Sequence, residues 1–363
     1  MMSKRFTINL EDEYISNTNN SNKIFPSTRY QGSKLKISDW IMTIIKDLNF
    51  NTCLDAFGGS GCISYGLKKL NKSVTYNDIL KFNYLFGKAL IENNEVRLSK
   101  SDISYILKKH DEIEYPTVIE DNFKDIYFTD DENKWLDQTI TNIYSLKDEY
   151  KYSLAFFALS QACIIKRPYN LFHRKNLYMR TSNVKRSFGN KITWDRPFDE
   201  YFIKFSKEAN ESIFDNGKDN VAKNEDAIGM DNNYDLVYID TPYISEKGTT
   251  VDYHAFYHFL EGLTDYNNWE RNIDFKYKHN RLKPIKNPWN NKKSVHRCFN
   301  DLFGNFEDSK IVVSYRSDGI PSENQLKSIL EQYKSKVEIY YYGNYKYALS
   351  KNSNSKEILL VGV

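Results

Sequence analysis

The sequence predicts an α/β fold, in which a parallel sheet with helices is interrupted by a mainly helical insertion. A strand, a glycine loop, a helix and a second strand follow one another between residues 51 and 78, the pattern of a parallel α/β unit. This rhythm stops near residue 95 and returns near residue 221. A chain of 363 residues has room for one such core and a sizeable insertion.

The elements of the first unit follow from the hydrophobic pattern. Residues 28–48 begin as a glycine-containing turn and continue as an amphipathic helix, whose apolar residues recur at helical spacing. Residues 51–57 (NTCLDAF) predict a short strand, 58–61 (GGSG) a tight loop, 62–70 a helix and 73–78 (SVTYND) a second strand.

The remaining chain divides by composition. Residues 95–215 predict an inserted domain, because they contain helical segments rich in lysine, aspartate and aromatic residues, with few strands between them. Segments 24–94 and 216–363 form the α/β core, and the polar, asparagine-rich residues 1–23 predict a flexible arm. The later strands of the core are predicted at YDLVYID (234–240), SKIVVSYRSD (309–318), KVEIYYYGNYKYAL (336–349) and KEILLVGV (356–363).

Composition excludes several classes of protein. No run of about eighteen apolar residues occurs and the N-terminus lacks the apolar core of a signal peptide, so we expect no membrane span and a cytoplasmic protein. The four cysteines are scattered, without a CxxC pair, so neither a metal site nor a disulfide framework is expected. The net charge of +3 does not by itself decide whether the protein binds nucleic acid.

The stretch DAFGGSG (55–61) predicts a ligand-binding loop. Its glycines let the backbone turn sharply, and the helix that follows points its N-terminal amides at a bound group. Asp78, at the end of the next strand, is placed to accept hydrogen bonds from both hydroxyls of a ribose. Two alternatives stay open: such a loop can simply connect a strand to a helix, and Asp78 can simply cap the following helix.

The turn DTPY (240–243) follows a buried strand, at the edge where open α/β sheets bind ligands. Because proline fixes the backbone, Asp240 and the carbonyl of Thr241 can both accept hydrogen bonds from one exocyclic amine. Tyr243 can stack on the face of the same ring. The alternative is an ordinary type I turn with proline at its second position.

With these motifs in this order, the sequence resembles the Dam-like (alpha group) adenine-specific DNA methyltransferases, which use S-adenosylmethionine. The family commonly has a proline where Thr241 stands, and we expect the Thr241 side chain to point away from the base. The resemblance implies a Rossmann-like methyltransferase core with a mixed seven-stranded sheet and an inserted target recognition domain. It covers residues 24–363 and rests on RYQGSK (29–34), DAFGGSG (55–61), YND (76–78), NED (224–226) and YIDTPY (238–243), and more loosely on VDYHAFYHFLEGL (251–263) and SKIVVSYRSDGIP (309–321).

The resemblance also implies site residues. Lys34 would reach the carboxylate of the cofactor or a loop acid, Asp78 would hold the ribose and Asp226 would approach the adenine amino group of the cofactor. The target base would be held by the catalytic residues Asp240, Pro242 and Tyr243. The cofactor-binding residues implied are Tyr30, Gly32, Lys34, Asp55, Phe57, Gly59, Asp78, Asp226 and Asp240.

Two basic stretches predict a DNA-binding surface. Residues 166–191 and 281–297 carry many lysines and arginines and no acid. Residues 172–194 predict turns and a hairpin that resembles the DNA-contacting hairpin of the family, although solvated charged loops remain the alternative for both stretches. The DNA-binding residues predicted are Arg174, Lys175, Arg180, Lys185, Arg186, Lys191, Lys292 and Lys293.

The implied reaction is methyl transfer from S-adenosylmethionine to the N6 amine of an adenine flipped out of duplex DNA. The alternative is methylation of the cytosine N4 amine, where serine more often replaces Asp240. We expect His254 and His258 to share one helix face and to pack or contact DNA.

The resemblance further implies a modification enzyme of a bacterial restriction–modification system, with double-stranded DNA as its partner. The sequence leaves open whether a cognate restriction endonuclease, acting separately, accompanies the enzyme. No membrane partner is expected. We expect a monomer, because one copy of the chain carries every motif.

Overall fold

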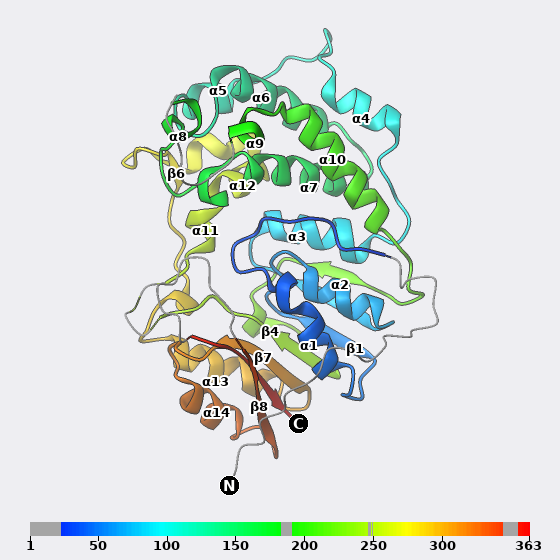
Figure 1. The fold of residues 1–363 in the computed structure, drawn as a ribbon, viewed down its shortest axis with the longest axis vertical. Helices are drawn as coiled ribbons and strands as arrows, with labels where there is room; N and C mark the ends of the chain where they lie inside the picture. The colour runs from blue at the N-terminus through cyan, green and yellow to red at the C-terminus, as the bar shows by residue number, and fades with distance from the viewer. Residues whose placement is uncertain (1–22, 183–190, 246–247, 249, 344–354) are drawn as a thin grey trace.

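The centre of the computed structural model, which describes residues 23–182, 191–245, 248, 250–343 and 355–363, is a seven-stranded sheet (Figure 1). The strand order is β3-β2-β1-β4-β7-β9-β8. Neighbours pair in parallel as far as β7, whereas β9 is antiparallel to both β7 and β8. The predicted mixed α/β sheet is therefore confirmed. Its strands are β1 (Thr52–Asp55), β2 (Ser73–Asn77), β3 (Val221–Lys223), β4 (Leu236–Ile239), β7 (Lys310–Arg316), β8 (Val337–Tyr342) and β9 (Glu357–Gly362).

Both faces of this sheet are buried. Leu236 and Val312 belong to one apolar cluster, whereas their chain neighbours Val237 and Val313 belong to the other. This alternation explains why the central strands are continuous apolar runs, as parallel strands covered on both faces are. The helices that contribute to the first cluster include α1 (Ser38–Ile45), α2 (Cys62–Lys69) and α3 (Lys81–Gly87), and those of the second are α13 (Val295–Asn305) and α14 (Glu323–Leu330).

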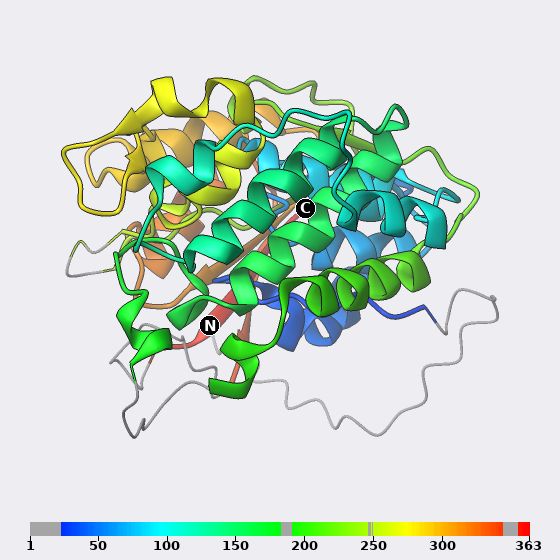
Figure 2. The same ribbon diagram turned by 90° about the horizontal axis from the view of Figure 1, so that it is seen from above.

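The chain between α3 and β3 is helical in its described part. It packs on the core through contacts such as that of Phe86 with Phe157, whose ring centroids lie 5.1 Å apart. Viewed from above, the green helices of this segment form a layer over the blue helices of the core (Figure 2). Its helices are α4 (Lys100–Leu107), α5 (Val118–Asn122), α6 (Asp130–Tyr144), α7 (Glu149–Ile165), α8 (Tyr178–Thr181), α9 (Lys191–Asp195) and α10 (Phe198–Ser212).

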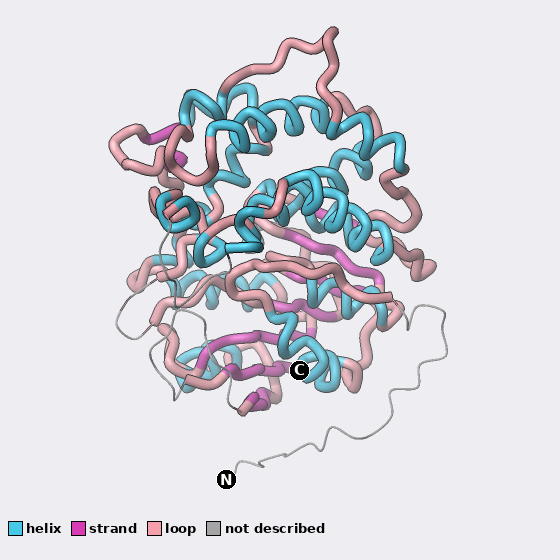
Figure 3. Tube along the Cα trace, turned by 45° about the horizontal axis from the view of Figure 1, so that its top comes forward, coloured by secondary structure: helices cyan, strands magenta, loops and turns pink. Residues whose placement is uncertain are grey.

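Two short helices and a hairpin follow β4. Helices α11 (Tyr253–Phe256) and α12 (His258–Leu263) precede the antiparallel pair β5 (Ile273–Asp274) and β6 (Arg281–Leu282), which lies apart from the central sheet (Figure 3). Six further helical turns complete the fold: η1 (Lys34–Ile37), the π-helical η2 (Lys88–Glu92), η3 (Pro168–Asn170), η4 (Ala227–Gly229), η5 (Tyr266–Asn272) and η6 (Pro288–Asn290).

The hairpin expected within residues 172–194 is not found in the described part of that stretch. The described residues form a loop and the short helices α8 and α9, and residues 183–190 lie outside the described chain. The polar residues of the stretch are typical of turns. However, Arg180 on α8 pairs with Glu132 on α6 and donates to the Trp194 carbonyl on α9, and no local pattern reveals these contacts. The predicted arm, residues 1–23, also lies outside the described residues except for its last member.

The apolar residues of helix α7 are buried inside the protein. Its residues from Ser153 to Ile165 are all buried within the protein, between α10, α6 and α3. Across the described ranges, no helix has the length and hydropathy needed to cross a bilayer.

The close packing of the Tyr76 ring against Gly87 can be tested by substitution. A Cβ atom added at Gly87, on α3, would overlap this ring, whereas one added at Gly229 would meet no atom within 4 Å. We expect Gly87→Ala to lower the free energy of unfolding by about 1–2 kcal/mol, since overpacking outweighs the helix-propensity gain. Gly229→Ala is the control and should stay within about 0.5 kcal/mol of wild type in urea unfolding. Equal stability of the two variants would show that Tyr76 is free to move.

Candidate active site

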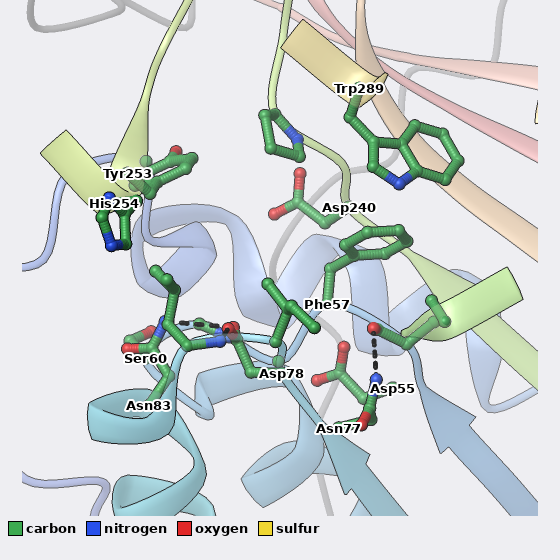
Figure 4. Close-up of a pocket in the computed structure, with 18 of the residues that line it drawn as sticks. Asp55, Phe57, Ser60, Asn77, Asp78, Asn83, Asp240, Tyr253, His254 and Trp289 are labelled. Atoms are coloured by element: carbon green, nitrogen blue, oxygen red, sulfur yellow. Dashed lines mark hydrogen bonds between the residues drawn. The ribbon is translucent and has the colours of Figure 1, made fainter. Parts of the chain in front are cut away.

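A cleft opens at the carboxyl ends of β1, β2 and β4, where parallel sheets bind ligands. Its empty volume is about 1420 Å³, including the open mouth. Figure 4 shows side chains from several elements converging on it, among them Asp78, Asp240, Tyr253 and Trp289. Ten residues predicted from the sequence line it: Tyr30, Gly32, Lys34, Asp55, Phe57, Gly59, Asp78, Asp226, Asp240 and Pro242.

The glycine loop forms the floor of this cleft. Gly59 and Gly61 have φ values of +52° and +82°, which side chains with a Cβ rarely adopt. Gly58 is required for a different reason, because a Cβ there would overlap the Tyr76 ring. The amide of Gly58 donates to the carbonyl of Asn77 (2.8 Å), so the loop is tied to the end of β2.

Asp78 holds the loop and the start of the next helix together. Its Oδ2 accepts from the Gly59 amide (2.9 Å) and from Asn83 Nδ2 (3.0 Å), and its Oδ1 accepts from the Leu80 amide (2.8 Å). Burial raises the pKa of Asp78 to about 6. Leu80, not Asp78, occupies the N-cap of α3, so the alternative in which Asp78 caps that helix is wrong.

Two other acids line the same part of the cleft. Asp55 is buried, its Oδ2 accepts from Ser64 Oγ (2.6 Å), and its Oδ1 has no partner among the described residues. Burial raises the pKa of Asp55 to about 7. Asp226 accepts from the Ile228 amide (3.1 Å) and lies beside Glu225, which also lines the cleft. This end of the cleft is rich in carboxylates.

At the other end, Asp240 is anchored by one oxygen. Its Oδ1 accepts from Lys34 Nζ (2.8 Å) and from the Tyr243 hydroxyl (2.9 Å), while Oδ2 accepts from no residue in the described chain. Burial raises the pKa of Asp240, and the Lys34 charge opposes that rise. Burial would lower the pKa of Lys34, but Asp240 and Glu357 together hold it above its ordinary value, so Lys34 stays protonated.

The position predicted for Tyr243 is wrong. Its side chain does not line the cleft; the ring packs edge-on against Tyr315 with centroids 5.2 Å apart, and the hydroxyl faces Lys34, Asp240 and Glu357. The hydroxyl accepts from Lys34 and shares its single proton between Asp240 and Glu357 at the base of the cleft, and these partners draw the ring into the core. Thr241, as expected, also points away from the cleft and is buried.

Aromatic side chains that sequence reasoning missed line the cleft instead. Tyr253, from α11, stacks on Tyr30 with centroids 5.6 Å apart and planes 8° from parallel, and Trp289, from η6, stands on the opposite wall (Figure 4). Aromatic residues do follow DTPY in the sequence, but no local sequence pattern predicts that Tyr253 and Trp289 fold back to line the cleft.

The two histidines do not share one helix face, contrary to expectation. Tyr257 separates α11 from α12, so His254 lines the cleft while His258 is buried and contacts the Tyr127 hydroxyl (2.7 Å). Their spacing of four residues suits one continuous helix, and the break between the two helices is a tertiary feature. Among the described residues, no group of three metal-ligating side chains occurs.

Arg180 is a correction among the predicted DNA-binding residues. It is only 5% exposed, donates to Glu132 (2.7 Å) and to the carbonyl of Tyr127 (3.0 Å), and so joins α8 to α6. Burial of a charged group demands such partners, and they leave Arg180 unable to reach a phosphate.

The other predicted basic residues differ in surroundings. Arg174, Lys175, Lys292 and Lys293 are exposed, and Lys191 pairs with Asp195 at 2.7 Å. Lys185 and Arg186 lie outside the described residues.

A family model described as D12 class N6 adenine-specific DNA methyltransferase matches residues 30–329. This span contains every predicted cleft residue and ends before β8 and β9. Because the matched family is specific for adenine N6, the alternative of cytosine N4 methylation is not favoured.

Three relatives illustrate the similarity. The chain is 29% identical over 328 residues to the type II methyltransferase M2.HphI of Haemophilus parahaemolyticus, covering 88% of this chain and 91% of that protein. It is 29% identical over 367 residues to the modification methylase StsI of Streptococcus sanguinis (91% and 50%), and 27% identical over 328 residues to the type II methyltransferase M.FokI of Planomicrobium okeanokoites (84% and 47%). The chain therefore spans nearly all of the first relative and about half of the other two.

The raised pKa of Asp55 predicts a pH dependence of stability. Between the unfolded pKa near 4 and the folded pKa of about 7, the folded protein binds more protons at this residue, so stability falls as pH rises. The stability advantage of Asp55→Asn over wild type should grow by up to about 1.4 kcal/mol per pH unit across that window. Urea unfolding from pH 4.5 to 7.5 measures it, and a difference that is constant with pH would contradict the burial of an ionisable Asp55.

Proposed function

The chain belongs to the D12 class N6 adenine-specific DNA methyltransferase family, whose members use S-adenosylmethionine, and on this premise we propose that its cleft methylates the N6 amine of an adenine extruded from duplex DNA. The observation that carries this proposal is Asp240, held at the cleft by one oxygen while the other has no partner in the described chain. An open carboxylate oxygen beside a proline turn suits an exocyclic amine.

The carboxylate-rich end of the cleft suits the cofactor. S-adenosylmethionine carries a positive sulfonium and an ammonium group, and when bound it supplies a methyl group on that sulfur. Asp55 supports this fit, because its buried Oδ1 lacks a partner among the described residues and can accept from a cation. Asp78 and Asp226 would accept from the ribose and the adenine, and the backbone of Phe57 and Gly59 would pass beside the methionine part.

The other end of the cleft suits the target base. Asp240 Oδ2 and the Thr241 carbonyl would accept the two amine hydrogens, which draws the nitrogen lone pair out of conjugation with the ring. The rings of Tyr253 and Trp289, rather than that of Tyr243, line the cleft where the base would stack. Pro242 would restrict the backbone of the turn and so limit movement of the Thr241 carbonyl.

The chemistry then needs little beyond positioning and charge. The amine would gain positive charge during transfer, and the Asp240 carboxylate would stabilise that charge. Holding amine and methyl group in line converts an encounter between two molecules into a step within one complex. The proton leaves the amine after transfer, so no strong base is required.

Two segments far apart in sequence carry exposed basic residues and contact the same buried tyrosine, which supports a DNA-binding role for both. The Tyr127 hydroxyl donates to the carbonyl of Phe172, in the loop that carries Arg174 and Lys175, and contacts the carbonyl of His279 (3.1 Å), in the β5–β6 hairpin. The Phe172 amide in turn donates to the Phe256 carbonyl (2.9 Å) on α11, whose Tyr253 and His254 line the cleft. The loop and the hairpin therefore adjoin the rim of the cleft.

The hairpin has the side chains that DNA contacts require. Phe275 is 60% exposed and Tyr277 is 42% exposed, and both lie among the exposed lysines Lys276 and Lys278. Lysines neutralise phosphates, and exposed aromatic rings can stack on bases. We propose that this hairpin, with Arg174, Lys175, Lys292 and Lys293, holds the duplex while the inserted residues 95–215 serve in target recognition.

The names of the relatives support a biological setting. They are called type II methyltransferases and modification methylases, so we propose that this chain is the modification enzyme of a bacterial restriction–modification system, working in the cytoplasm as a monomer. A restriction endonuclease with the same recognition site would act separately.

Replacing the acid that faces the amine tests the reaction. We expect Asp240→Ala to lower methyl transfer to duplex DNA by at least about 10²-fold, because it removes the group that stabilises the developing charge. Cofactor affinity, measured by calorimetry, should change little, because Glu357 still pairs with Lys34 and holds it in place. Radiolabelled transfer followed by nucleoside analysis measures rate and product together.

The control for this variant is Asp231→Ala, because the Asp231 side chain is 82% exposed. It should keep wild-type rates. Full activity in Asp240→Ala, or a product other than N6-methyladenine in wild type, would contradict the proposed function.

Charge removal tests the basic surface. A variant with Arg174→Ala, Lys175→Ala, Lys276→Ala and Lys278→Ala should bind duplex DNA more weakly, and its salt slope should fall by about 0.9 for each phosphate that the variant no longer neutralises. Fluorescence anisotropy from about 50 to 200 mM salt measures both quantities. Lys327→Ala with Lys336→Ala is the control, since these lysines lie on α14 and just before β8, outside the inserted segment. An unchanged slope in the fourfold variant would place the DNA elsewhere.

A further inference from the structure

Glu357 is a buried carboxylate that lies behind the cleft without lining it. It begins β9, is 0% exposed and falls beyond the span matched by the family model. A carboxylate removed from water is costly unless donors surround it. The donors around Glu357 therefore indicate what it does.

Three donors meet at a single oxygen of Glu357. Its Oε1 lies 2.8 Å from Ser314 Oγ, 3.1 Å from the Tyr243 hydroxyl and 3.3 Å from Lys34 Nζ. Two of these donors, Lys34 and Tyr243, are also the two that anchor Asp240 Oδ1. Lys34 and Tyr243 thus lie between the Asp240 carboxylate, which lines the cleft, and the Glu357 carboxylate, which is buried in the core.

This arrangement fixes which oxygen of Asp240 faces the cleft. The Lys34 ammonium has three protons and can serve both carboxylates, whereas the Tyr243 hydroxyl has only one to donate. Because Glu357 pairs with Lys34 and shares the single Tyr243 proton with Asp240, neither group can swing into the cleft and cover Asp240 Oδ2. The same contacts pull the Tyr243 ring out of the cleft and against Tyr315.

We propose that Glu357 is a positioning residue for methyl transfer: through Lys34 and Tyr243 it holds Asp240 with Oδ2 turned toward the target amine. This inference rests on the proposed function. Ser314 secures Glu357 from the neighbouring strand β7.

A second consequence concerns charge. Glu357 is a like charge close to Asp240 and raises its pKa, whereas Lys34 and the Tyr243 hydrogen bond lower it. The ionised form of Asp240 is the one that accepts from an amine, so the acid limb of the rate profile should report its titration. The titratable and charged groups that face this pair from the surrounding elements are Lys34, Asp55, Cys62, Tyr238, Tyr243 and Tyr253.

The test compares three variants of the full chain in single-turnover methyl transfer to a duplex. Glu357→Gln keeps the shape of the side chain but removes the charge, so we expect the rate to fall at least tenfold and the acid limb to move to lower pH. Tyr243→Phe removes a hydrogen bond that lowers the pKa of Asp240, so its acid limb should move to higher pH. Glu338→Gln, on the neighbouring strand β8, is the control and should keep the wild-type rate and profile.

Two further readouts separate positioning from folding. Glu357→Gln should bind S-adenosylmethionine within twofold of wild type, and should still enhance the fluorescence of a duplex with 2-aminopurine at the target position. Loss of cofactor binding together with activity would overturn the proposal in favour of a purely structural role. A wild-type rate with an unshifted acid limb in Glu357→Gln would also overturn it.

Failure of the proposed function would look different. Wild-type protein would then transfer no methyl group to adenine in any duplex, before any variant is compared. A wild type that methylates adenine beside a Glu357→Gln variant with normal rates overturns only the role of Glu357.

Discussion

The ion pair between Lys34 and Asp240 joins two segments 206 residues apart, and the geometry of the cleft depends on it. Lys34 opens η1 before the first strand of the sheet, whereas Asp240 follows the central strand β4. Their contact brings the RYQGSK turn across the carboxyl ends of the strands and closes one side of the cleft. Such a pair, with side chains 4% and 18% exposed, is expensive to break because Asp240 would lose the cation that offsets the cost of its burial.

The buried carboxylates of the cleft are stabilised in two different ways. At the Asp240 end, one protonated lysine serves two carboxylates, and hydroxyls from Tyr243 and Ser314 supply the remaining hydrogen bonds. At the glycine-loop end, no lysine is present among the described residues that bind Asp55 and Asp78; hydroxyl, amide and backbone donors hold them, and burial raises their pKa values. A cationic cofactor would complement this second end, which explains why the acids there lack the cation that Asp240 already has.

The candidate DNA surface depends on a different junction, centred on Tyr127. This residue is buried, and its hydroxyl contacts the loop of Phe172, the hairpin residue His279 and the helix residue His258. Three segments from different parts of the chain thereby lie side by side, next to helix α11, whose Tyr253 and His254 line the cleft. Arg167 and Arg180 strengthen the junction by donating to the Tyr127 carbonyl, which is why these two arginines are buried rather than exposed to DNA.

The sequence by itself determined the α/β fold, the inserted helices and ten of the residues that line the cleft, because these follow from local patterns. Apolar runs specify strands, glycines permit the positive φ values at Gly59 and Gly61, and the ends of parallel strands must meet at one edge of a sheet. Only the tertiary structure decided which way each polar side chain turns. Tyr243 and Arg180 look suited to the cleft and to DNA in the sequence, yet both are buried, because partners distant in sequence satisfy their hydrogen bonds. Exposure is a property of packing across the whole fold, and that is also why Glu357, an acid in a strand near the C-terminus that no motif distinguishes, comes to lie behind Asp240.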